Sequence, residues 1–297
     1  MTEPLGTSLL DLSRDLAQLV ETAAPSVVAV AGARRHGTSA IHWRSGILVT
    51  AEEALEQDED IQVTLPDGRR AAATLVGRDP STDVAVLRFT PDGLAVAATG
   101  TASALRPGHL VVAVGRHADG PVASLGIASF VGGAWQSQRG GTIDQYLRLD
   151  LTLSPSAEGG ALIDATGAVL GMTVLGPRRR ALAIPPGTID RAVDQLIAKG
   201  HVARGYLGAG LQPVRLDRDG GTSGILVVSI DPKGPAAGAG LLVGDVVTAW
   251  DGAPVGRVRE VMRRLGTDSV GRNVNLALLR GGQPMVLGIT LGERPLT

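Results

Sequence analysis

The sequence predicts a mainly β protein, a double antiparallel β-barrel followed by a small α+β domain. From Ser26 to Leu175, short β-rich runs recur between turn signals, a rhythm typical of closed antiparallel barrels. The chain also has 41 glycines and 17 prolines, which suit many short strands and turns. A hydrophobic content of 44% excludes a disordered chain, and 297 residues suffice for two domains with cores. Since aromatic residues make up 2%, the cores must consist of Val, Leu, Ile and Ala.

The elements are predicted in order along the chain. Residues 8–20 carry leucines at helical spacing, and we expect this helix to pack on the barrel, with an oligomer contact as the alternative. Strands are then expected at residues 26–31, 46–50, 61–65, 83–89, 110–114 and 168–174. Residues 187–200 predict a helix that closes the first domain, with Ile189, Val193, Leu196 and Ile197 on one face and Gly200 at its end.

Charge and composition narrow the functional classes. The formal net charge of -1 argues against general binding to nucleic acid or an acidic membrane. The absence of cysteine excludes disulfides and thiolate chemistry. No apolar run reaches the roughly 18 residues of a membrane span, and the acidic N-terminus carries no secretory signature. We therefore favour a cytoplasmic location, with no membrane span and no nucleic-acid partner.

Three segments resemble the active-site segments of a trypsin-fold protease. The segment Asp150-Leu-Thr-Leu-Ser-Pro-Ser-Ala-Glu-Gly-Gly-Ala-Leu162 keeps the Asp, Pro, Gly-Gly and Leu of the nucleophile loop, and Glu158 stands at the serine. Thr50-Ala-Glu-Glu53 resembles the histidine segment and places Glu53 at the base. Asp79-Pro-Ser-Thr-Asp83 retains the third triad residue, Asp83. The loop that shapes the oxyanion hole is also altered, to Ser156-Ala157.

The chain as a whole resembles the HtrA (DegP/DegQ-like) family. The similarity includes residues 15–30, Val122-Ala-Ser-Leu-Gly-Ile-Ala-Ser129 and Ala181-Leu-Ala-Ile-Pro185. The resemblance implies a helical segment at residues 1–25, a trypsin-like domain at 26–200 and a PDZ domain at 204–297. Trimers of this family are usually held by N-terminal aromatics, which this chain lacks. A homo-oligomer and a partner protease both remain open.

The second domain carries the PDZ motifs. Pro235-Ala-Ala-Gly-Ala-Gly-Leu241, followed by Gly244-Asp245, resembles the PDZ core. The resemblance implies that Tyr206, Leu207, Gly208 and Ala209 form the carboxylate-binding loop, and that Val258 and Met262 of a helix at 256–265 line the groove. A PDZ groove adds a ligand strand to its sheet edge, so the expected partners are protein C-termini or unfolded peptides.

These observations predict a pseudoprotease rather than an enzyme: an inactive homologue that binds peptides or regulates a partner through its PDZ domain. A carboxylate cannot act as a base-activated hydroxyl does at a peptide carbonyl. Two alternatives stay open. One is an active serine endopeptidase with a rearranged site, and the other is a metal-binding carboxylate site in the old cleft. No cofactor and no metal ligand are assigned.

If the barrels form, Glu53, Asp83 and Glu158 converge in one cleft. Two carboxylates about 5 Å apart repel by roughly 3 kcal/mol at an effective dielectric constant near 20. The charge is then relieved by solvent, by an arginine or by a bound divalent cation. The run Arg178-Arg-Arg180 is the expected internal counterion.

Overall fold

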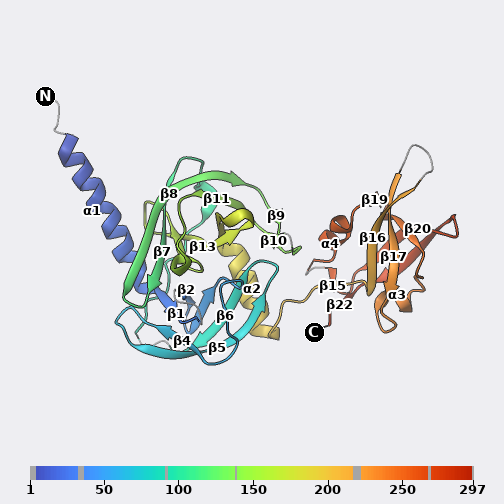
Figure 1. Ribbon diagram of the computed structural model, residues 1–297, viewed down its shortest axis with the longest axis horizontal. Coiled ribbons are helices and arrows are strands. Elements are labelled where there is room, and N and C mark those ends of the chain that lie inside the picture. Colours follow the sequence, from blue (N-terminus) through green and yellow to red (C-terminus); the bar gives the residue numbers. More distant parts are fainter. Residues whose placement is uncertain are drawn as a thin grey trace. The chain divides into compact units, whose positions relative to one another are not determined.

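The computed structural model describes residues 5–32, 37–90, 93–137, 139–216, 222–266 and 269–295. The chain divides into two compact units, Met1–His201 and Val202–Thr297, each with its own core (Figure 1). Residues 1–4 of the predicted N-terminal segment and 296–297 of the predicted second domain lie outside the described residues. None of the described helices has the length and apolar character that crossing a membrane requires.

The first unit contains the double barrel that the sequence predicts. Its strands are β1 (Val27–Val30), β2 (Thr38–Arg44), β3 (Ile47–Thr50), β4 (Ile61–Thr64), β5 (Arg70–Asp79), β6 (Val84–Phe89), β7 (Leu110–His117), β8 (Gly120–Gly132), β9 (Trp135–Gln136), β10 (Thr142–Ile143), β11 (Tyr146–Asp150), β12 (Ala161–Ile163), β13 (Val169–Gly176) and β14 (Arg180–Ile184). One barrel closes in the order β1-β2-β3-β6-β5-β4 and the other in the order β11-β14-β13-β12-β7-β8. The predicted mainly β fold class is therefore confirmed.

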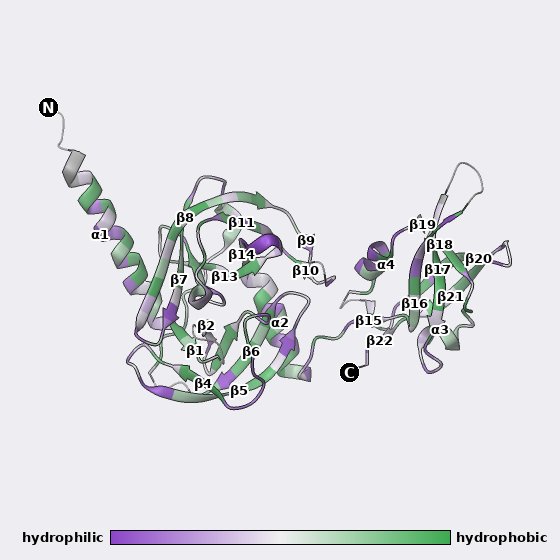
Figure 2. Ribbon diagram, in the orientation of Figure 1, coloured by the Kyte–Doolittle hydropathy of each residue, from purple (hydrophilic) through white to green (hydrophobic). Residues whose placement is uncertain are grey.

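Aliphatic side chains fill both barrels. Val28, Leu48 and Leu87 lie in the first core, and Leu147 and Leu162 lie in the second. Figure 2 shows hydrophobic residues along the strands of both barrels. Burying one such side chain stabilises the fold by about 1.5–3 kcal/mol, so many aliphatic residues substitute for the missing aromatics.

The two helices of the first unit differ from their predicted packing. Helix α1 (Leu5–Ala23) leaves its first turns exposed, with Leu9 at 67% exposure, because no other described part of the unit lies beside them (Figure 1). Leu16 and Leu19, further along, contact the β7 region. Helix α2 (Pro186–Lys199) buries most of its predicted apolar face and ends at Gly200, whose φ of 74° is left-handed. Ile197 was placed on that face wrongly, since it is 41% exposed.

The second unit is a sheet with two helices. Its elements are β15 (Gly205–Tyr206), β16 (Ala209–Leu216), β17 (Thr222–Ile230), α3 (Pro235–Gly238), β18 (Val246–Trp250), β19 (Ala253–Pro254), α4 (Val258–Arg264), β20 (Asn273–Arg280), β21 (Gln283–Thr290) and β22 (Gly292–Glu293). The strand order is β16-β17-β18-β20-β21, which leaves β16 as an edge strand, and β15 pairs with β22. Helix α4 lies against β16.

Candidate functional site

A cavity of about 330 Å³ lies in the first unit, lined by residues of both barrels. The first barrel contributes Glu53, from the turn after β3, and residues 80–83, from the turn between β5 and β6. The second barrel contributes the apolar side chains Val174, Leu175, Leu182 and Ile184. The separate β9-β10 hairpin contributes Trp135, Arg139 and Ile143. The predicted base and third triad positions therefore face one cavity.

Asp83 is held in place by its backbone and by Glu53. It adopts a left-handed conformation, with φ of 59°. The amide N–H of Glu53 donates to its Oδ1 at 2.9 Å, and the amide of Glu52 donates to its carbonyl oxygen at 3.3 Å. In a Ser-His-Asp arrangement the aspartate would receive a histidine N–H. Here the described contact to position 53 comes from the backbone of a glutamate.

Burial raises the pKa of Asp83 to about 7. The negative charges of Glu53, Glu158 and Glu52 contribute to this raised pKa, and the hydrogen bond from the Glu53 amide opposes it. Both causes disfavour the ionised carboxylate. Near neutral pH Asp83 thus exchanges a proton with solvent, unlike an ordinary surface aspartate.

Glu158 follows a short 3₁₀ turn at Pro155–Ala157 and leads into β12. Its Oε1 accepts a hydrogen bond from the amide of Leu175, a cavity residue, at 3.2 Å. Burial raises the pKa of Glu158, the charge of Glu53 adds to this effect, and the Leu175 amide and the charge of Arg179 oppose it. The charges of Glu53 and Glu158 raise the pKa of Asp83, and the charge of Glu53 raises the pKa of Glu158. Glu53 and Asp83 belong to the first barrel, and Glu158 precedes β12 of the second.

In the predicted oxyanion loop, two backbone amides donate to carbonyl oxygens of the same loop. The amide of Glu158 donates to the carbonyl of Pro155 at 3.2 Å, and that of Ala157 donates to Ser154 at 2.9 Å. The Ser156 carbonyl accepts from the Ser39 hydroxyl at 2.6 Å, which ties the loop to the first barrel. Oxyanion stabilisation requires N–H donors aimed at the reacting oxygen. In this conformation the Glu158 amide already has an acceptor within the turn.

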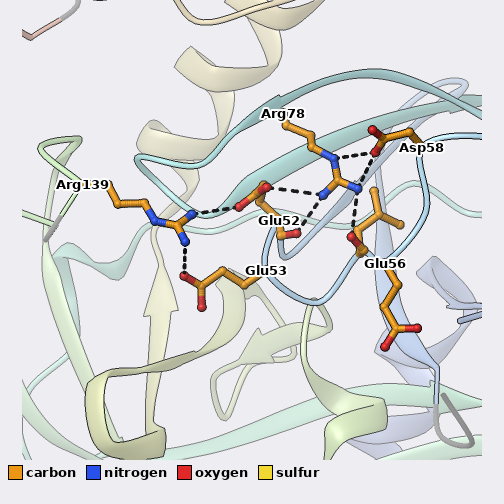
Figure 3. A pocket seen from close by; sticks show the side chains of 7 residues that line it. Glu52, Glu53, Glu56, Asp58, Arg78 and Arg139 are labelled. Carbon is orange, nitrogen blue, oxygen red and sulfur yellow. Dashed lines mark hydrogen bonds and ion pairs between the residues drawn. The ribbon is translucent and has the colours of Figure 1, made fainter. Parts of the chain in front are cut away.

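Sequence reasoning missed Arg139. Its Nη2 lies 3.1 Å from Glu53 Oε1 and its Nη1 lies 3.2 Å from Glu52 Oε2 (Figure 3). Arg78 joins the same network, with Nη1 3.4 Å from Glu52 Oε1 and Nη2 2.7 Å from Asp58 (Figure 3). The arginine paired with Glu53 is therefore outside the predicted run.

The predicted counterion run, Arg178–Arg180, has a smaller effect on the pKa of Glu158 than burial has. Arg178 and Arg179 both have left-handed backbones, with φ of 59° and 55°, and their side chains are exposed. The charge of Arg179 lowers the pKa of Glu158, but burial has the larger, opposite effect on the same pKa. No local pattern distinguished Arg139, because its partners follow β3 and only the packing of the two barrels brings them near.

Both ring nitrogens of His42, a residue of β2, contact the backbone. His42 is buried and held as a neutral ring, since Nδ1 donates to Ala95 O at 2.9 Å and Nε2 accepts from Gly46 N at 3.2 Å. His36 lies outside the described residues. Within the described ranges, no group of three or more His, Asp or Glu is placed to hold a metal ion.

In the second unit, the predicted carboxylate loop runs from β15 into β16. The Leu207 side chain is 3% exposed and belongs to the hydrophobic core of the unit. Gly208 has φ of 76° and lies so close to Gly234 that an added Cβ would come within 2.9 Å of its Cα. Ala209 begins the edge strand β16. Val258 packs partly against the core, while Met262 is 38% exposed.

Family models match both units. Residues 37–172 match the trypsin-like peptidase domain, and residues 205–291 match the PDZ domain. The fold and these matches define the class of the chain, a trypsin-fold peptidase domain followed by a PDZ domain.

The chain is also similar to known serine endoproteases. The chain is 33% identical to a probable periplasmic serine endoprotease DegP-like of Halomonas elongata, over 88% of this chain and 57% of that protein. It is 29% identical to the serine endoprotease DegS of Escherichia coli, over 89% of this chain and 78% of that protein. A solved serine endoprotease from Yersinia pestis matches with a TM-score of 0.73 and 30% identity, over 94% of this chain and 98% of that one. The HtrA-type protease AlgW with decapeptide matches with a TM-score of 0.75 and 27% identity, over 95% and 99%. The chain belongs to the HtrA family.

These relatives correct one prediction. The chain was expected not to be an enzyme, whereas the relatives that it matches are named serine endoproteases. The expectation rested on two side chains, Glu53 and Glu158. A catalytic constellation is defined by geometry and roles rather than by alignment position, so two substitutions do not decide the class. The chain spans little more than half the length of the DegP-like relatives.

Proposed function

We propose that this HtrA-type chain binds the C-termini of proteins or unfolded peptides through its second unit, and that this binding has a regulatory role. In the same proposal, Glu53 and Glu158 stand at the base and nucleophile positions of the trypsin-like unit. The observation that carries the proposal is the edge strand β16, which lies beside α4 and directly follows the turn at Leu207–Gly208.

The geometry of this edge suits an added strand. A strand at the edge of a sheet presents backbone N–H and C=O groups that an extended peptide pairs with. Met262 of α4 offers an exposed apolar side chain on the neighbouring helix. The turn at Gly208 precedes the edge, where backbone N–H groups would receive a terminal carboxylate. The related HtrA-type protease AlgW has been solved with a decapeptide.

The test uses the full chain and fluorescent decapeptides with an apolar C-terminal residue. We expect amidation of the peptide carboxylate to weaken binding about 10- to 100-fold, because charge-assisted hydrogen bonds are lost. Met262→Lys should also weaken binding. The matched control is Val286→Lys, because Val286 is 67% exposed on β21, the opposite edge of the sheet. Equal affinity for free and amidated peptides would contradict the proposal.

Peptide hydrolysis is a second candidate, favoured by the names of the relatives. It needs a nucleophile other than the side chain at position 158, and Ser154 and Ser156 lie in the same loop, with their hydroxyls 3.2 Å apart. Hydrolysis through this loop predicts that a fluorophosphonate probe labels one of them, and that replacing the labelled serine by alanine abolishes turnover of casein. Turnover without labelling at either position would exclude both.

A further inference from the structure

We propose that the cavity between the two barrels binds a cationic side chain of a peptide, a lysine ammonium or an arginine guanidinium, with its alkyl stem against the apolar wall. This inference concerns the first unit and does not depend on peptide binding by the second. It rests on the shape of the cavity, on the chemistry of its wall and on the balance of charge around it.

The wall fits an alkyl stem. Buried aliphatic side chains line the cavity: Val174, Leu182 and Ile184 from the second barrel, and Ile143 from β10. A cavity of about 330 Å³ has room for a four-carbon stem with a terminal charged group. Long cationic side chains bury their methylene groups along apolar surface and place the charge at a polar end. The polar end here is formed by the first barrel.

The polar end carries an excess of negative charge. Glu53 and Asp83 line the cavity, and Glu158 adjoins it through its hydrogen bond to the amide of Leu175, a lining residue. Arg139 is the cation among the lining residues, and it is divided between Glu53 and Glu52. Three carboxylates thus surround a space that contains one shared arginine.

The neighbouring cations do not remove this excess. Arg78 pairs with Glu52 and with Asp58 (Figure 3), and none of these three residues lines the cavity. Arg179 favours the ionised form of Glu158 but is an exposed side chain. A cationic ligand supplies the missing charge, whereas a neutral side chain of equal length leaves the carboxylates uncompensated and an anionic one adds repulsion.

Because Asp83 titrates near neutral pH, the affinity of the cavity for a cation should depend on pH. Without a cation, burial and the neighbouring carboxylates raise the pKa of Asp83 to about 7. A bound cation favours the ionised form, so binding releases a proton from the fraction of molecules in which Asp83 is protonated. Affinity for the cation therefore increases as the pH rises from 6 to 8, until Asp83 is already ionised before binding.

The experiment compares three acetylated and amidated pentapeptides with the full chain by calorimetry. Their sequences are Ala-Ala-Xaa-Ala-Ala, with lysine, norleucine or glutamate at the centre. Amidation removes the terminal carboxylate that the second unit is proposed to bind. The experiment therefore tests cation binding by the first unit independently of peptide binding by the second. We expect the lysine peptide to bind at least about 10-fold more tightly than the norleucine peptide, and the glutamate peptide to bind most weakly.

Variants and pH distinguish binding at the cavity from nonspecific attraction of the lysine peptide to acidic residues elsewhere on the protein. Asp83→Asn keeps an oxygen to accept the Glu53 amide and should reduce the preference for lysine and remove its pH dependence. The control Glu21→Gln changes an exposed acid of α1 and should leave both unchanged. Equal binding of the lysine and norleucine peptides, or no binding of the lysine peptide at pH 8, would overturn the proposal.

A second measurement needs no variant. Carboxyl NMR follows the titration of Asp83 with and without n-butylammonium chloride, against sodium chloride at equal ionic strength. We expect n-butylammonium to lower the apparent pKa of Asp83 and sodium to leave it unchanged. An identical titration in both salts would count against a cation site at this cavity.

Discussion

Asp245 of the second unit is buried and Asp83 of the first unit is half-buried, and their surroundings shift the pKa of the two carboxylates in opposite directions. The side chain of Asp245 in the second unit is 2% exposed, and its two oxygens accept from Arg280 Nε at 2.8 Å and Nη2 at 2.7 Å. The Arg280 hydrogen bonds hold the pKa of Asp245 below its usual value, against the effect of burial and together with the Leu242 amide. Asp83 in the first unit accepts the Glu53 amide, and its pKa is raised to about 7 by burial.

The carboxylate of Asp245 is part of an ion pair within its unit, whereas the carboxylate of Asp83 lines a cavity. A bidentate arginine satisfies Asp245 within its own unit, so no ligand is needed. Next to Asp83, Glu53 shares Arg139 with Glu52. Perturbed pKa values of this kind concentrate at functional sites, although structural networks also produce them. Four substitutions test this contrast.

The largest effect is expected on catalysis. The double substitution Glu53→His and Glu158→Ser places a base at a residue that lines the cavity and a hydroxyl at a residue that adjoins it. Its rate on casein should remain about 10²- to 10³-fold below that of an HtrA relative, because the amide at position 158 donates to Pro155 and one oxyanion donor is lost. The single substitution Glu158→Ser is the control. A rate equal to that of the relative would show that the loop rearranges readily.

Breaking the pair in the second unit has the next largest effect. Asp245→Asn should lower the free energy of unfolding of that unit by about 3 kcal/mol, because it leaves Arg280 without its carboxylate. Hydrogen exchange of β18 and β20 in the full chain measures the change. Asp251→Asn is the control, since its exposed side chain keeps an oxygen for the amide of Asn275. A loss below about 1 kcal/mol would show that Asp245 is not essential to the core.

Removing the charge of Asp83 should stabilise the first unit. Its folded pKa of about 7 lies above the ordinary aspartate value of 3.8, so ionisation costs stability progressively as the pH rises from 3.8 to 7 and fully above that. Asp83→Asn should therefore raise the free energy of unfolding at pH 8 by about 2 kcal/mol and change nothing near pH 3.5. Urea unfolding at both pH values measures this. Equal effects at both values would mean that packing, not charge, dominates.

The smallest effect is expected at Glu158. Glu158→Gln keeps an acceptor for the Leu175 amide and removes one charge, so it should stabilise the protein by about 0.5 kcal/mol at pH 7.5. The sign follows from the raised pKa of Glu158, whose ionised form costs folding free energy above its unfolded pKa. Thermal melts at pH 7.5 and 4 measure the difference. Destabilisation at pH 7.5 would mean that Arg179 compensates the charge.

Local patterns in the sequence determined much of the fold. Recurrent short apolar runs and turn residues predicted the two barrels, which the structure contains. Gly200 predicted the end of α2, because a left-handed residue closes a helix and glycine adopts that conformation freely. Motif spacing also predicted that Glu53, Asp83 and Glu158 lie near one another, and Glu53 and Asp83 line one cavity. These features depend on neighbours along the chain.

The tertiary structure alone decided which charges meet and which apolar faces are covered. Glu53 pairs with Arg139, between β9 and β10, rather than with a residue of the Arg178–Arg180 run. Leu9 of the predicted helical stripe is exposed. Helical periodicity marks a face as apolar but does not say how far another element extends along it. An ion pair between barrels depends on how two separately closed sheets pack, and that geometry is set by contacts distant in sequence.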